Sequence, residues 1–114
     1  MEITEEKIKK IIGLRLYFEA PSDWTTREYI EIIDEYLMER LPVMINNSLE
    51  PYGLEASIME GIDECSLGIS PCSKDTIVAE IYPAGSSKPL FRVIFYRKIG
   101  ENTYEFTIKR VLKA

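Results

Sequence analysis

One amphipathic pattern dominates the chain between residues 25 and 49, which read TTREYIEIIDEYLMERLPVMINNSL. At 100° per residue, apolar side chains recur at steps of three and four along one side of this segment: Ile30, Ile33, Leu37, Leu41 and Met44. Thr25 and Glu28 have the spacing of a capping box at its start. The pattern predicts a long helix, and the rest of the chain must cover its apolar side.

Pro42 lies near the end of this pattern. Because proline cannot donate a backbone hydrogen bond, we predict a kink or break at Leu41 and a second helical piece from Pro42 to about Leu49. A shorter helix is predicted near the N-terminus. Thr4 can cap it, acidic residues occupy its first turn and lysines its last, and Gly13 can end it.

Elsewhere the apolar residues alternate with polar ones, as in strands with one buried face. The alternating segments are 14–19, 54–59, 65–70, 77–82, 91–96 and 104–109. The linkers after residue 53 are too short for a parallel crossover helix, so these strands should form an antiparallel meander. The sequence therefore predicts a single α+β domain over residues 1–114, with an antiparallel five- or six-stranded sheet and two or three helices packed on one face.

The segment 90–96 is apolar on both of its faces, which a strand with one face in water should not be. Either this strand is central and covered twice, or it meets another copy of the chain. We predict a homodimer, with Leu90, Ile94 and Tyr96 at the dimer interface.

Charge is divided unevenly along the chain. Residues 1–86 carry 17 acidic and 7 basic side chains, whereas residues 87–114 carry 2 acidic and 7 basic. An acidic body disfavours general nucleic-acid binding, because phosphate neutralisation supplies most of that affinity. No apolar run approaches the roughly 20 residues of a membrane span, and the first residues lack a signal-peptide pattern. We therefore expect a cytoplasmic protein that does not bind membranes. The absence of glutamine and the many Glu, Lys and Ile residues suggest a thermophile.

No residue pattern predicts catalysis, a metal or a cofactor. The chain has no histidine, which removes the usual nucleophile–base pairs and leaves two cysteines as a poor metal site. Cys65 and Cys72 are either free thiols, which we favour, or a short local disulfide. Asp63 and Glu64 are interpreted as the solvated end of a hairpin.

One edge of the predicted long helix is acidic. Its carboxylates lie about 5–6 Å apart along the helix and resemble the phosphates of a nucleic-acid strand, so this edge could occupy a basic groove. A second apolar line runs beside it. We expect the two lines together, called the acidic helix surface, to bind a partner protein; the alternative is a solvated acidic edge beside a wide face packed on the sheet. Its residues are Glu28, Tyr29, Glu31, Ile32, Asp34, Glu35, Tyr36 and Glu39.

An alternative site lies in the basic C-terminal strands. Cations interleaved with a tyrosine on a sheet can bind single-stranded nucleic acid, although they are more often a solvated face or a protected edge. This alternative would use Tyr96 together with Arg92, Arg97, Lys98, Lys109, Arg110 and Lys113.

Two stretches carry a family resemblance: residues 13–28, GLRLYFEAPSDWTTRE, and residues 91–99, FRVIFYRKI. Together they resemble small anti-CRISPR proteins of rod-shaped and filamentous archaeal viruses that block type I-D interference. The resemblance implies a non-enzymatic, homodimeric inhibitor that binds the large subunit of a CRISPR effector complex in the host cytoplasm. This chain departs from that pattern by a cysteine-flanked hairpin at 65–72 and a long loop at 83–89. A binding inhibitor is our expectation, and single-stranded nucleic-acid binding is the alternative.

Overall fold

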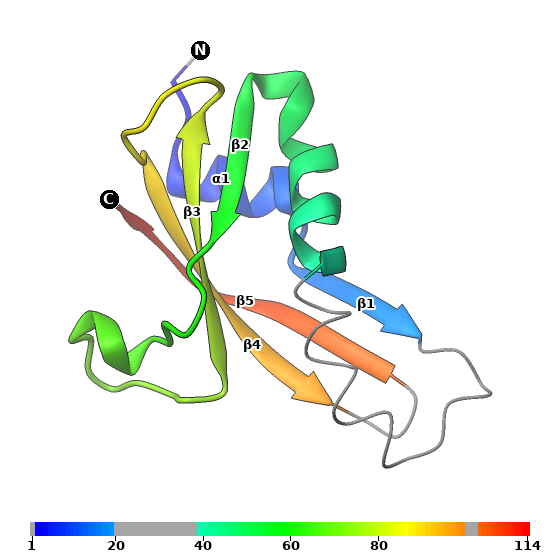
Figure 1. The fold of residues 1–114 in the computed structure, drawn as a ribbon, viewed down its shortest axis with the longest axis vertical. Helices are drawn as coiled ribbons and strands as arrows, with labels where there is room; N and C mark the ends of the chain where they lie inside the picture. Colours follow the sequence, from blue (N-terminus) through cyan, green and yellow to red (C-terminus); the bar gives the residue numbers. More distant parts are fainter. Residues whose placement is uncertain (1, 20–38, 100–102) are drawn as a thin grey trace.

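The computed structural model describes residues 2–19, 39–99 and 103–114. Two helical segments and five strands make up most of this part of the chain (Figure 1). Residues 39–49 are helical, and the other elements are α1 (Glu5–Ile12), β1 (Arg15–Glu19), the 3₁₀ turn η1 (Glu50–Tyr52), β2 (Leu54–Ile58), the 3₁₀ turn η2 (Cys65–Leu67), β3 (Thr76–Pro83), β4 (Phe91–Ile99) and β5 (Thr103–Lys113).

The sheet has the strand order β1-β5-β4-β3-β2, and every neighbouring pair is antiparallel. Strands β2 to β5 form the predicted meander, and β1 adds to its far edge beside β5. The sheet is strongly curled, and α1 and the 39–49 helix both pack on one of its faces (Figure 1). The predicted α+β class and antiparallel sheet are therefore confirmed, with five strands.

The sixth predicted strand, at 65–70, does not form. The amides of Ser66, Leu67 and Gly68 donate to carbonyls three residues earlier, over 3.1–3.2 Å, and Gly68 ends the turn with a φ of 74°. These local hydrogen bonds use the donors that a strand would need for its neighbours, so the alternation of apolar residues here does not mark a strand.

Helix α1 forms as its charges and caps predict. The Thr4 side chain accepts from the Lys7 amide at 3.3 Å, and the Gly13 amide closes the helix on the Lys9 carbonyl at 2.9 Å. Ile8 and Ile12, one turn apart, are buried against the sheet.

The 39–49 helix buries Leu41, Ile45 and Leu49, which are spaced four residues apart. Helical structure continues through Pro42, so the predicted break at Leu41 does not occur. Proline removes a single backbone hydrogen bond, and the buried side chains on both sides of it hold the turn against the core.

Asn46 attaches this helix to the edge of the sheet. Its amide oxygen accepts from the Ala56 N–H at 2.6 Å, and its amide nitrogen donates to the Ala56 carbonyl at 3.2 Å. The side chain thus satisfies the outward backbone groups of Ala56 in β2, an edge strand, which limits pairing with another chain there.

The central strand β4 is covered on both faces. Phe91, Val93 and Phe95 join the core beneath the helices, whereas Ile94 and Val78 point to the other face and are nonetheless fully buried. Of the two alternatives for the doubly apolar segment, the central strand is the one found. Among the described helices, none has the length and apolar character needed to cross a membrane.

Candidate functional site

An irregularity in β5 places two consecutive cations on the sheet face away from the helices, called here the second face. Ile94 pairs with Arg110 and Phe95 pairs with Ile108, so Lys109 is one extra residue in β5. A bulge of this kind opposes two residues to one and breaks the alternation of side chains. The Lys109 ammonium consequently lies 5.2 Å from the ring centroid of Tyr96, a second-face residue of β4.

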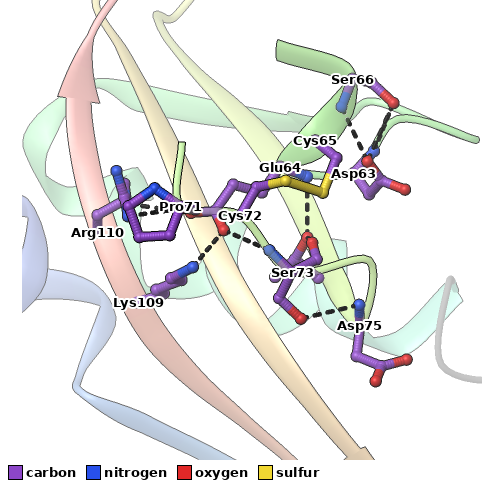
Figure 2. The surroundings of a disulfide bond; sticks show 11 residues. Asp63, Glu64, Cys65, Ser66, Pro71, Cys72, Ser73, Asp75, Lys109 and Arg110 are labelled. Atoms are coloured by element: carbon purple, nitrogen blue, oxygen red, sulfur yellow. Dashed lines mark hydrogen bonds and ion pairs between the residues drawn. A yellow bond between two sulfur atoms is a disulfide. The ribbon is translucent and has the colours of Figure 1, made fainter. Parts of the chain in front are cut away.

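Glu64 lies between these two cations and is fully buried (Figure 2). Its Oε1 accepts hydrogen bonds from Lys109 Nζ and, at 2.8 Å, from the Ser73 amide. Its Oε2 forms a 3.0 Å ion pair with Arg110 Nε whose N–H is not aligned for a hydrogen bond. One carboxylate therefore forms ion pairs with both of the cations that the bulge has brought together.

The backbone around Glu64 is fixed as well. The Glu64 amide donates to Thr76 Oγ1 at 2.9 Å, and that hydroxyl donates to the Ser73 carbonyl at 2.8 Å. Because Thr76 belongs to β3 and Arg110 to β5, the segment that carries Glu64 spans the second face of the intervening strand β4. This position accounts for the burial of Ile94.

Burial by itself raises the pKa of the Glu64 carboxyl. The hydrogen bonds from Lys109 and the Ser73 amide, with the charges of Lys109 and Arg110, outweigh it and hold the pKa below the ordinary value. The neighbouring Asp63 also has a lowered pKa, chiefly because its carboxylate accepts the Ser66 amide at 2.9 Å.

Cys65 and Cys72 form a disulfide, with their Cα atoms 5.2 Å apart, so the prediction of free thiols is wrong. The 3₁₀ turn at Cys65 folds the chain back and brings the two residues together, a geometry that a strand at 65–70 would not allow. The interpretation of Glu64 as a solvated hairpin end is also wrong, because the residue is fully buried and both of its ion-pair partners lie more than forty positions away in the chain.

A signal for the bulge was present in the sequence. The core residues of β5 are even-numbered at Tyr104, Phe106 and Ile108, and the next apolar residue packed on the core is Val111. A shift from even to odd positions within one strand requires one extra residue. No comparable pattern points to Glu64, whose role depends on chain segments that meet only in three dimensions.

Three cations of the predicted basic site form ion pairs in the folded chain. Lys109 and Arg110 bind Glu64, and Arg92 Nε lies 3.6 Å from Glu80 Oε2. Arg97 pairs with the core residue Phe106 and so lies on the helix-covered face, apart from the others. Lys98 and Lys113 are exposed.

The three residues predicted for a dimer interface do not form one exposed patch. Leu90 and Tyr96 are 42% and 41% exposed, whereas Ile94 between them has no exposed surface. The chain itself covers Ile94, so only the two ends of this stretch are available for contact with another molecule.

Of the acidic helix surface, Glu39 lies in the described part of the chain, and it is exposed on the 39–49 helix. The other members lie outside the described residues: Glu28, Tyr29, Glu31, Ile32, Asp34, Glu35 and Tyr36. Val43 is exposed too, at 52%, so the helix side away from Leu41 and Ile45 faces water.

Within the part of the chain that the structure describes, no group of three or more acidic or cysteine side chains is arranged to hold a metal ion. Comparisons with protein-family profiles, curated proteins and solved structures find no match to this chain.

Proposed function

We propose that this protein is a non-enzymatic interaction protein that inhibits a host complex acting on nucleic acid, of the CRISPR effector class, by binding it directly. The binding surface is the acidic helix surface, which ends at Glu39. The two stretches that resemble anti-CRISPR proteins of archaeal viruses suggest the class of target.

The observation that carries this proposal is the orientation of the 39–49 helix. Leu41, Ile45 and Leu49 face the core, and Glu39 faces water. In the sequence, Glu35 and Glu31 precede Glu39 at steps of four, the spacing of side chains on one helical face. The shared spacing with the exposed Glu39 supports a line of acidic side chains that faces outward and can compete with nucleic-acid phosphates for a basic groove.

The test is a binding and inhibition assay with purified type I-D effector complex. The wild-type protein should bind the complex and reduce its capture of target DNA. Glu31→Lys/Glu35→Lys should lose both effects, and Glu39→Lys should weaken them. Glu60→Lys is the matched control, because Glu60 is exposed in the turn after β2 and lies outside the proposed surface.

Two results would remove the proposal: no binding of the complex by the wild-type protein, or equal binding by wild type and Glu31→Lys/Glu35→Lys.

Homodimerisation belongs to the same proposal, and its interface would be formed by the exposed Leu90 and Tyr96. Light scattering at micromolar concentration measures it directly, and a monomer mass would contradict it.

A further inference from the structure

The second sheet face carries the elements of a binding surface for single-stranded nucleic acid. Tyr96 is exposed and can stack on a base, and Lys98 stands beside it on the same side of β4. Lys109 and Arg110 lie next to this pair because of the bulge in β5. The nearby Glu105 is already ion-paired with Arg15 at 2.8 Å, which limits its repulsion of phosphates.

Glu64 occupies the position that a phosphate would take on this surface. Its two oxygens contact Lys109 and Arg110, whose side chains are only 13% and 30% exposed beneath the segment that carries it. A bound carboxylate and a bound phosphate make the same kind of contact with such a pair. The chain thus holds its own anion in the site (Figure 2).

Besides Glu64 and the disulfide, the segment over the site is held by hydrogen bonds at its ends, through Thr76 Oγ1, and by a 3.5 Å hydrogen bond from Arg110 Nη2 to the Pro71 carbonyl. None of the residues 65–75 is buried. Cys65 directly follows Glu64 and Cys72 directly precedes Ser73, so the disulfide joins the two residues next to the Ser73–Glu64 hydrogen bond. Few buried contacts mean a low cost of local opening once the covalent link is broken.

We propose that the disulfide controls access to this surface: reduction of Cys65–Cys72 releases Glu64 and exposes Lys109 and Arg110 to single-stranded nucleic acid. In the oxidised protein both cations stay ion-paired with Glu64 and covered by the segment that carries it. The proposal is independent of the acidic helix surface, with which it shares no residue.

The reaction is a thiol–disulfide exchange with a dithiol reductant. A thiolate of the dithiol attacks Sγ of Cys72, an exposed residue, and Cys65 Sγ leaves as a thiolate. The second thiol then displaces Cys72 and closes the reductant into its cyclic disulfide. Two electrons pass to the protein, and each cysteine ends with one proton supplied by the dithiol.

The test measures binding of a fluorescent oligothymidylate by anisotropy at low salt, with and without dithiothreitol. Reduction of the wild type should lower Kd by at least about tenfold and steepen the slope of log K against log salt by about 1.4, the value for two phosphate contacts on a single strand. Cys65→Ser/Cys72→Ser should bind like the reduced protein and show no response to dithiothreitol.

Two further variants identify the groups involved. Glu64→Gln removes the internal anion and both of its ion pairs with the disulfide intact, so the oxidised variant should bind tighter than the oxidised wild type, and reduction should tighten binding further. Lys109→Ala/Arg110→Ala should abolish the gain on reduction. Lys9→Ala/Lys10→Ala is the matched control. It also removes two positive charges, but from α1, which covers the opposite face of the sheet, and it should keep the gain in affinity on reduction.

Circular dichroism is recorded for every protein, and amide hydrogen exchange at Ser73 and Glu64 should accelerate when the disulfide is reduced. Equal Kd for the oxidised and reduced wild type overturns the proposal, as does a gain that survives Lys109→Ala/Arg110→Ala. If the cysteine variant or the reduced protein unfolds, Glu64→Gln decides: a folded Glu64→Gln protein that binds no tighter than the oxidised wild type also overturns it.

Discussion

Asn46 and Ala56 are joined by two hydrogen bonds, so a helix side chain takes the place of a neighbouring strand at the edge of β2. Asn46→Ala leaves the N–H and carbonyl of Ala56 without these partners, and the free energy of unfolding should fall by about 1–3 kcal/mol. Urea denaturation measures the loss. Asn47→Ala removes an exposed neighbour and should change stability by less than about 0.5 kcal/mol. Similar losses in the two variants would contradict the role of Asn46.

Lys109 is the extra residue in β5, so its deletion should leave a regular strand. Ile108 and Val111 would then be two positions apart and would both still face the core. The deletion variant should unfold cooperatively, with only moderately reduced stability from the lost contact to Glu64.

Deletion of Thr107 is the matched comparison, because it also shortens β5 by one residue. It would turn Ile108 outward and Lys109 into the core, and the free energy of unfolding should fall by more than about 4 kcal/mol. Differential scanning calorimetry of both variants tests the bulge, and equal loss of stability would argue against it.

The lowered pKa of Glu64 makes stability depend on pH in the acid range. The folded protein holds this carboxyl ionised below its ordinary pKa of 4.5, so the unfolded chain binds more protons there. The stabilisation is present above pH 4.5 and is lost as the pH falls through the folded pKa. Asp63, whose pKa is also lowered, acts in the same direction.

Glu64→Gln should therefore flatten the fall in the free energy of unfolding as the pH drops below 4.5. Urea titrations at half-unit intervals measure this slope. Glu60→Gln, in an exposed turn, is the control and should keep the wild-type slope. An unchanged slope in Glu64→Gln would show that the carboxylate is not held ionised by its partners.

The disulfide should stabilise the fold as well as the loop. Cys65→Ser/Cys72→Ser is expected to lower the free energy of unfolding by about 2–3 kcal/mol, from the added freedom of the unfolded chain. Ser70→Ala, in the same exposed loop, should change it little. Thiol titration of the unfolded, non-reduced protein should detect no free thiol, and two thiols per chain would contradict the bond.

The sequence was sufficient to predict the elements whose cause is local. The caps of α1, the strands of the meander and the turn residues between them depend on neighbours a few positions apart, and they formed near the predicted places. The predicted apolar side of the helix is confirmed at Leu41, which is buried, whereas the predicted Met44 is only partly buried and Ile45 takes the core position beside it. Alternation failed at 65–70, because three apolar residues in a loop satisfy the same pattern as a strand.

The arrangement of the candidate site depended on the tertiary structure. Lys109 is 45 residues from Glu64 in the chain, and no periodicity relates the two. Their meeting requires the 3₁₀ turn at Cys65, the bulge in β5 and the order of the strands together. Local spacing determined which segments became helices and strands. The pairing of the buried Glu64 carboxylate with Lys109 and Arg110 was decided only by the tertiary structure. The reason is that burial and ion pairing of this kind arise only when segments far apart in the chain close over one face of the sheet.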